Sequence, residues 1–509
     1  MTTRSRRSGA VLDPALVFVL ACTLFALHGT QGPLDRDLGV FLYGGEQVAH
    51  GVPSYVGIFN SVGPLSDAVP GLVVAAGDRL GIDPILATRV VYLALSAGCC
   101  AALYLLGRRT FRSRAAGFLA ASVLACAATF TEFASDGPRE KTLMLLLLLL
   151  ALVWLLDRRW FLAGAATAAA TLTWQPAFAV AVAAALVAVA VERGGRVRAF
   201  VGYVVGGLVP TGIAVAVFAA DHALRPAIDG FLVINAGYTR QPSLLTDPAL
   251  DVRLMWGGYA WTILPFLVGL AVLPLLLAVH WRGGGARRRA LVVVLAAALA
   301  SVGWLLVAMN GPPDLFDVLP FGALGFAGLV LLVAGALPEP GRLALVASCV
   351  ATAMVATAVV AVATRTDELA AQRAVVDGVV GRLPPGATVL SVNAPDAMVL
   401  ADRTNPTPWQ VFNGSEDRFL NAHLPGGLSQ YAAWVSQTQP DLVVLGDRNP
   451  EEWLHRVLRL QYVDLGTTGR WHWYASTGLG APRLQALRAT VAADRGLLPP
   501  PRSLQPGPT

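Results

Sequence analysis

Residues 142–156 read TLMLLLLLLALVWLL, a run of apolar side chains without a single charge. A helix rises about 1.5 Å per residue, so roughly 15 to 25 such residues cross the apolar core of a bilayer. We expect a membrane-spanning helix here and at ten further apolar runs: 15–29, 86–106, 114–131, 161–174, 176–191, 200–220, 258–281, 290–309, 318–336 and 343–364. The sequence therefore predicts an α-helical polytopic membrane protein with about eleven transmembrane helices.

The composition of the 509-residue chain agrees with this prediction. Hydrophobic residues make up 55% and charged residues 14%, and the mean hydropathy is +0.60. A soluble globular protein carries roughly 25% charged residues. One or two aqueous cores could not enclose this many apolar side chains, so a water-soluble globular protein is excluded.

The distribution of positive charge predicts how the chain is oriented. Lys and Arg number 38 against 32 Asp and Glu. Arginine clusters recur in alternate loops between the apolar runs, as cytoplasmic loops of membrane proteins do: Arg108, Arg109, Arg112 and Arg114; Arg158 and Arg159; Arg193, Arg196 and Arg198; Arg287, Arg288 and Arg289. We therefore expect a multi-pass protein of the cell membrane with a cytoplasmic N-terminus, and no nucleic-acid partner. An odd number of spans places the C-terminus outside.

The chain divides at about residue 365, where long apolar runs stop. We assign 1–364 to a transmembrane domain, 365–497 to a small extracytoplasmic α/β domain and 498–509 to a proline-rich disordered tail. The expected strands of the α/β domain are 388–392, 441–445, 462–465 and 471–474, and the expected helices are 427–438 and 450–460. Trp471 and Trp473 alternate with His472, a pattern more typical of a strand with one buried face than of a sugar platform.

The long polar stretch after the first apolar run carries the most informative motifs. It opens with Asp35, Arg36 and Asp37 and continues through GVPSY at 51–55 and GPL at 63–65. Over about the first 190 residues, including LTWQP at 172–176, the chain resembles the GT-C superfamily of integral-membrane glycosyltransferases. It departs from the family pattern by the inserted Ser54 and by the absence of a lysine before Pro64.

The resemblance implies that a sugar is taken from a polyprenyl-phosphate donor on the outer face, with inversion, and that an acid of the first loop is the base. A sugar that leaves on phosphate needs little protonation, so one carboxylate can suffice. Asp35 and Asp37 are both candidates, and both would be ionised at neutral pH. In an extended segment they would share one face and Arg36 would point away.

The donor phosphate requires positive charge in a region of low dielectric. Arg139 and Lys141, the only lysine of the chain, lie in the second external loop, and Arg89 lies near the start of the second apolar run. A solvated turn in which Asp136 starts the next helix is the alternative for this loop. Further site candidates are Asp136, Glu140, Tyr55 and Arg240.

A metal or a cofactor is not required by these motifs. A divalent cation held by Asp37 and Asp136 stays open, although the sequence offers no full ligand set. All five cysteines fall inside apolar runs without CxxC spacing, so neither a zinc site nor a disulfide framework is expected.

Two other functions remain open: a noncatalytic GT-C-like subunit, and a membrane transporter of envelope precursors. Transporters place ionisable residues within the membrane and often contain broken helices. The apolar runs here have hardly any interior charge, and only the break at 174–176 (WQP) would favour transport. The acceptor of a transferase could be a glycan, a lipid or a protein.

Overall fold

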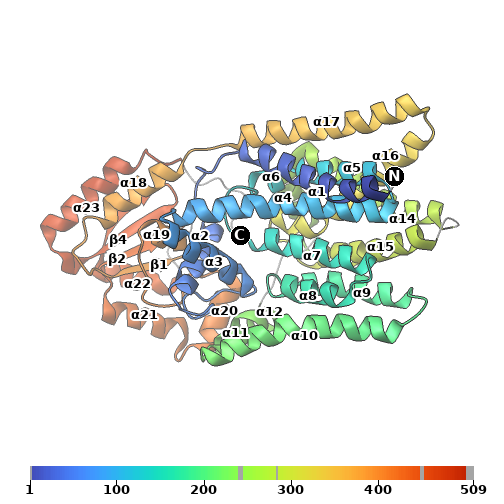
Figure 1. Cartoon of the computed structure of the whole chain (residues 1–509). Coiled ribbons are helices and arrows are strands. Elements are labelled where there is room, and N and C mark those ends of the chain that lie inside the picture. Colours follow the sequence, from blue (N-terminus) through green and yellow to red (C-terminus); the bar gives the residue numbers. More distant parts are fainter. Residues whose placement is uncertain (1–2, 239–244, 282–284, 447–451, 500–509) are drawn as a thin grey trace.

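The computed structural model describes residues 3–238, 245–281, 285–446 and 452–499. Figure 1 shows a bundle of long apolar helices at one end of the molecule and a mixed α/β part at the other. The bundle contains α1 (Thr3–Ala26), α4 (Pro84–Phe111), α5 (Arg114–Ala125), α7 (Glu140–Leu156), α8 (Trp160–Thr171), α9 (Ala177–Ala190), α10 (Arg196–Ala220), α14 (Leu264–His280), α15 (Gly285–Val307), α16 (Leu319–Gly335) and α17 (Glu339–Thr364).

Each of the eleven predicted apolar runs overlaps one of these helices, but the run 114–131 is divided between α5 and the short α6 (Ala128–Glu132), and the run 258–281 begins at the end of α13 (Pro248–Tyr259). Five helical regions of the described chain are long and apolar enough to cross a membrane by length and composition: Pro84–Phe111, Arg196–Ala220, Pro248–His280, Gly285–Val307 and Glu339–Val380. The number of eleven spans and the sidedness of the termini stay predictions.

Small residues bring neighbouring helices of the bundle into close contact. A Cβ on Gly269 of α14 would lie 1.8 Å from the carbonyl oxygen of Gly322 on α16. Helices in lipid gain little from the hydrophobic effect, so such backbone approach increases their van der Waals contact. Glycine is required at this crossing because any side chain would push the two helices apart.

Two shorter helices, α2 (Arg36–Ala49) and α3 (Leu65–Leu80), form within the stretch between α1 and α4. Leu38, Phe41 and Leu42 of α2 are buried, and they share a hydrophobic core with residues of the C-terminal part. Figure 1 accordingly shows α2 and α3 between the bundle and the sheet.

The C-terminal part contains a four-stranded sheet of order β1-β2-β4-β3. Strands β1 and β2 are parallel, and β4 pairs antiparallel with both β2 and β3. The strands are β1 (Val389–Val392), β2 (Leu442–Leu445), β3 (Tyr462–Thr468) and β4 (Trp471–Ser476); the helices are α18 (Leu369–Val380), α19 (Pro395–Leu400), α20 (Gly414–His423), α21 (Gly427–Thr438), α22 (Glu452–Gln461) and α23 (Ala481–Asp494).

The four strands and the helices α21 and α22 coincide closely with the predicted elements, whereas α18, α19, α20 and α23 were not predicted. Trp471 and Trp473 of β4 are fully buried, which agrees with a strand that has a buried face rather than a sugar platform. Within the predicted disordered tail, Leu498 is buried and packs against Gly469. The rest of that prediction, 500–509, lies outside the described residues.

The C-terminal part is docked directly onto α2. The backbone N–H of Leu34 donates to Oε1 of Gln372 at 2.7 Å, and Nε2 of Gln372 donates back to the Leu34 carbonyl at 3.3 Å. A Cβ on Gly39 would lie 2.5 Å from the backbone nitrogen of Asp396. Helix α2 therefore packs against α19 and shares a hydrophobic core with the sheet, and this packing crosses the predicted domain boundary at 364/365.

Candidate active site

The two aspartates of the first loop have different local roles. Asp35 is the N-cap of α2, and its Oδ1 accepts a hydrogen bond from the Leu38 N–H at 2.8 Å. Asp37 lies in the first helical turn, where Arg36 donates to its Oδ1 from Nε at 3.2 Å and from Nη2 at 3.0 Å. The extended arrangement with Arg36 pointing away is therefore wrong, because the cap satisfies an orphan N–H and starts the helix at Arg36.

Asp37 is the more accessible of the two carboxylates. Its side chain is 48% exposed, whereas that of Asp35 is 32% exposed and faces Nη2 of Arg139 at 3.6 Å. Burial by the surrounding protein raises the pKa of Asp37, but the charges of Arg36 and Arg139, with a smaller contribution from Lys141, lower it to about 2. Asp37 is thus ionised at neutral pH and lies within electrostatic reach of three cations.

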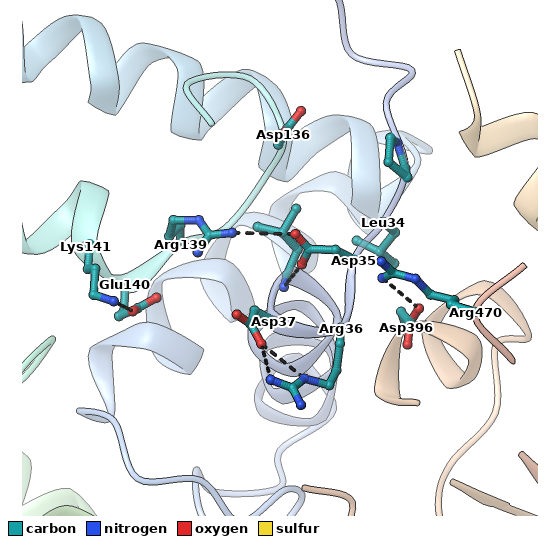
Figure 2. Close-up of polar contacts among 12 residues, drawn as sticks. Leu34, Asp35, Arg36, Asp37, Asp136, Arg139, Glu140, Lys141, Asp396 and Arg470 are labelled. Carbon is teal, nitrogen blue, oxygen red and sulfur yellow. Dashed lines mark hydrogen bonds and ion pairs between the residues drawn. The ribbon is translucent and has the colours of Figure 1, made fainter. Parts of the chain in front are cut away.

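Arg139 is held almost entirely inside the protein. It is the N-cap residue of α7, its side chain is 6% exposed, and its guanidinium lies 4.0 Å from the centre of the Phe133 ring. Figure 2 shows Arg139 pointing toward Asp35, with Asp37 on the same side of α2. Such a stacked, buried guanidinium is oriented before any ligand arrives.

Lys141 is fixed by a carboxylate from a distant part of the chain. Its Nζ lies 2.6 Å from Oδ1 of Asp314 and 3.3 Å from Oε1 of Glu140, and 5.5 Å from the centre of the Trp174 ring. The other oxygen of Asp314 accepts from two backbone N–H groups at the start of η3 (Pro312–Asp317). Both oxygens of Asp314 are therefore engaged, one by the turn and one by the ammonium.

Arg89 ties the first two external loops together. Its side chain is fully buried in α4 and donates to the carbonyl oxygens of Asp136 at 2.8 Å, Thr30 at 2.7 Å and Pro33 at 3.0 Å. All three acceptors are backbone groups of the segments that carry the site residues. Arg89 thus sets the spacing of these segments.

Asp136 lies in the loop before α7 but does not start that helix, which begins at Glu140. Oδ1 of Asp136 is 3.6 Å from Nδ1 of His28. The expectation that Asp136 starts the helix is therefore wrong, because the cap position is taken by Arg139. A cluster of three or more His, Cys, Asp or Glu side chains suited to a metal ion does not occur in the described part of the chain.

Tyr55 shapes the first loop from within. It has a positive φ of 68°, is 2% exposed, and its hydroxyl donates to the Val62 carbonyl at 2.6 Å. The bond connects the 51–55 motif to Val62, the residue directly before the 63–65 motif. Arg240 lies outside the described residues.

The 63–65 motif docks onto the break between α8 and α9. The N–H groups of Gly63 and Leu65 donate to the carbonyls of Thr173 and Leu172 at 3.1 Å and 3.0 Å. A Cβ on Gly63 would lie 2.1 Å from the Leu172 oxygen, so only glycine permits this approach. Nε2 of Gln175 also donates to the Ser61 carbonyl at 3.0 Å. The first external loop is thus hydrogen-bonded to the segment around the break at 174–176.

Asp314 is the site contact that the sequence did not indicate. The loop at 310–317 contains acids that local reasoning assigns to helix caps, and Asp314 does cap η3. Its ion pair with Lys141 depends on α7 and η3 being neighbours in space. A local sequence signal for that proximity does not exist, although an unpaired Lys141 among apolar helices could have prompted a search for a buried acid.

Comparisons with known proteins agree with this architecture. A family model described as dolichyl-phosphate-mannose-protein mannosyltransferase matches residues 68–219. No curated protein sequence matches the chain. ArnT from Cupriavidus metallidurans in the apo state is 16% identical with a TM-score of 0.64, and the match covers 94% of this chain and 100% of that one.

Two further solved structures are similar. ArnT from the same organism bound to undecaprenyl phosphate has 16% identity and a TM-score of 0.63, with 93% and 99% of the two chains covered. The oligosaccharyltransferase of Archaeoglobus fulgidus, in complex with Zn and sulfate, has 13% identity and a TM-score of 0.50, with 84% and 68% covered. The chain has the GT-C glycosyltransferase fold, and the resemblance inferred from its motifs is confirmed.

Proposed function

We propose that this protein is a membrane glycosyltransferase that moves a sugar from a polyprenyl-phosphate donor to an acceptor hydroxyl on the outer face, with inversion. The observation that carries the proposal is the position of Asp37: an accessible, ionised carboxylate within electrostatic reach of Arg36, Arg139 and Lys141. One carboxylate beside a cluster of cations provides what the transfer of a sugar from phosphate requires.

Each group then has a defined part in the reaction. Arg139 and Lys141 bind the phosphate oxygens of the donor and stabilise the negative charge that develops on them. Asp37 accepts the proton of the acceptor hydroxyl as its oxygen attacks the anomeric carbon. The bond from that carbon to the phosphate oxygen breaks, and polyprenyl phosphate leaves on the opposite face.

Asp37 is a better candidate for the base than Asp35. Oδ1 of Asp35 is occupied by the Leu38 N–H, and its other oxygen faces Arg139. Asp37 retains more accessible surface for an incoming hydroxyl. We assign Asp35 to the start of α2 and to the orientation of Arg139.

The remaining predicted site residues act indirectly in this proposal. The donors of Arg89 point to three backbone carbonyls, and the hydroxyl of Tyr55 is bonded within its own loop. We therefore assign both to positioning, and leave Arg89 out of the phosphate site. Glu140 contacts Lys141 from the same loop and helps to orient its ammonium. Asp136 accepts from Arg89 through its carbonyl.

The donor class is supported by the fold and by one of its relatives. The similar ArnT structure contains undecaprenyl phosphate, and the proposal extends a lipid phosphate of this kind to the present chain. With a cytoplasmic N-terminus, the connection between α1 and α4 and the C-terminal part face the outside. The acceptor is then a hydroxyl of a glycan, a lipid or a protein at that surface.

Sugar transfer by the purified protein in lipid tests the proposal directly. A panel of polyprenyl-phosphate sugars is compared for wild type, Asp37→Asn and Asp35→Asn. We expect Asp37→Asn to lower the rate at least about a hundredfold, the low end of what a general base contributes, while the protein keeps its thermal stability. Asp35→Asn, whose amide oxygen can still cap α2, should retain more activity.

Two results would contradict this assignment. A fully active Asp37→Asn variant would remove Asp37 from the chemistry. A folded wild type that transfers no sugar from any donor of the panel would favour the noncatalytic or transport function.

A further inference from the structure

A second candidate site lies on the C-terminal part, between α22 and the β3–β4 hairpin. A groove of about 720 Å³ opens there, with Leu458, Tyr462 and Tyr474 among its lining residues. Figure 1 shows α22 beside the sheet, on the side of α2 and α3 that faces away from the long apolar helices. The groove is thus separate from the surroundings of Asp37.

The sequence of α22 explains why charged side chains line this groove. Glu452, His455, Arg456 and Arg459 recur at helical spacing and are all exposed, whereas Leu454 and Leu458 are buried. Residues three or four apart share one face of a helix. The helix therefore buries its leucines and presents a charged face to the groove.

The groove contains hydrogen-bond donors that the protein itself does not use. Arg456 and Arg459 have no ion pair or hydrogen-bond partner among the described residues. Tyr462 is 6% exposed, and its hydroxyl has no hydrogen-bond partner in the described part of the chain. A buried hydroxyl without a partner is unfavourable, so a ligand that accepts from it would stabilise the site.

The charged side chains that line the groove balance formally, Arg456 and Arg459 against Glu452 and Asp464, but neither arginine is paired with either carboxylate. Oδ1 of Asp464 already accepts from the Gly466 N–H at 2.8 Å and lies 2.9 Å from Nε2 of His472. Glu452 stands one helical turn before Arg456 and makes no ion pair within the described residues. Two guanidinium groups and a phenol that the protein leaves without partners thus face the groove, together with two carboxylates, one of which is already hydrogen-bonded.

We propose that this groove binds an anionic saccharide, a short stretch of glycan that carries carboxylate groups. Guanidinium groups recognise carboxylates through paired hydrogen bonds, and a volume of about 720 Å³ falls within the 300–1,000 Å³ of ligand sites for molecules larger than a single ion. The inference deepens the proposed function, on which it rests: the groove would hold the acceptor glycan at a distance from the reacting hydroxyl.

Binding of a uronic-acid tetrasaccharide to the full-length protein in neutral-lipid nanodiscs tests this proposal. We expect Arg456→Gln and Arg459→Gln each to weaken binding about tenfold, since a hydrogen bond to a charged group contributes about 1.5–3 kcal/mol. Tyr462→Phe should weaken it severalfold. Arg483→Gln is the matched control, because Arg483 is an exposed arginine of α23 outside the groove, and it should change binding less than twofold.

Three outcomes would overturn the proposal. Equal weakening by Arg483→Gln would indicate attraction by net charge alone, and equal binding of a neutral tetrasaccharide would remove the need for the arginines. Binding of phosphatidylglycerol vesicles that depends on Arg459 while the uronic tetrasaccharide does not bind would assign the groove to lipid.

The same measurement separates this proposal from that of the transferase. The Asp37→Asn variant should bind the tetrasaccharide as the wild type does, although its transfer rate is strongly lowered. Arginine-dependent binding by a protein that is inert on every donor would support the groove and contradict the transferase. Sugar transfer by a protein whose tetrasaccharide binding does not depend on the arginines would support the transferase and contradict the groove.

Discussion

At the scale of single residues, Asp37 combines accessibility with a strongly stabilised negative charge. Its neighbour Arg36 is the largest of the influences that lower its pKa, and that pKa is about 2, below the roughly 3.9 of a free aspartate. The basic form is therefore complete above about pH 4 and is lost only as the pH falls through about 2. Arg36 keeps the carboxylate ionised without occupying the whole of its surface.

We expect Arg36→Gln to move the acidic limb of the transfer rate to higher pH. The substitution removes both the charge and the hydrogen bonds that lower the pKa of Asp37, so protonation of the base begins at a higher pH. The measurement is kcat/KM against pH for both proteins. Arg79→Gln, at an exposed arginine of α3, should leave the profile unchanged. An unmoved limb in Arg36→Gln would show that another group titrates.

At the scale of elements, the site depends on contacts between segments that are not neighbours in sequence. The turn η3 supplies Asp314 to the lysine of α7, and the first external loop docks on the break between α8 and α9 through Gly63. The first contact holds the Asp314 carboxylate 2.6 Å from the Lys141 ammonium, and the second holds the backbone of Gly63 3.1 Å from the Thr173 carbonyl. A change at either contact should therefore alter both stability and donor binding.

Asp314→Asn should destabilise the protein by up to about 3 kcal/mol, because it removes the shorter of the two ion pairs of a buried lysine and leaves Glu140 as its remaining carboxylate. Lys141 and Asp314 are 14% and 5% exposed. A polyprenyl phosphate that contacts Lys141 would replace the missing carboxylate, so its stabilising effect in thermal unfolding should be larger in Asp314→Asn than in wild type. The double variant with Lys141→Met should lose that effect. A ligand effect that survives the double variant would place the phosphate elsewhere.

Gly63→Ala should lower stability by about 1–3 kcal/mol, the typical cost of overpacking, because a Cβ there would lie 2.1 Å from the Leu172 oxygen. Gly212→Ala in α10 is the control, since a Cβ on Gly212 meets no atom within 4 Å. Thermal unfolding in detergent compares the two variants. Equal stability would indicate that the loop moves away from α8 at little cost.

At the scale of the whole molecule, the C-terminal part completes the core around α2. Leu38 and Leu42 of α2 belong to the same buried cluster as Val376 and Trp471. Without the C-terminal part, the buried face of α2 would meet water, and apolar burial contributes roughly 25 cal/mol per Å². We therefore expect the two parts to depend on each other for folding.

A chain that ends at Thr364 should consequently fail to fold as a monodisperse protein in detergent. Size-exclusion chromatography of the truncated and full-length chains checks this expectation. Removal of residues 500–509 alone is the control and should leave the elution profile unchanged, because Leu498, which packs on Gly469, is retained. A monodisperse truncated chain would show instead that the helical bundle and α2 fold without the sheet.

The helices and strands were largely predictable because their signals are local. An apolar run such as 142–156 gives a helix wherever it lies, and the alternation in 471–474 gives a strand with a buried face. The family resemblance and both candidate aspartates also followed from short motifs. The local fold of the first loop did not, because the N-cap of Asp35 converts an apparently extended segment into a helix.

The tertiary structure alone decided which of these residues meet. The sequence supplied Asp35, Asp37, Arg139 and Lys141 as candidates, but packing selected the accessible carboxylate and paired Lys141 with Asp314. Arg89, which could equally have bound phosphate, points to three backbone carbonyls. The physical reason is that side-chain partners far apart in the chain are set by how helices pack, and local patterns carry no information on that distance.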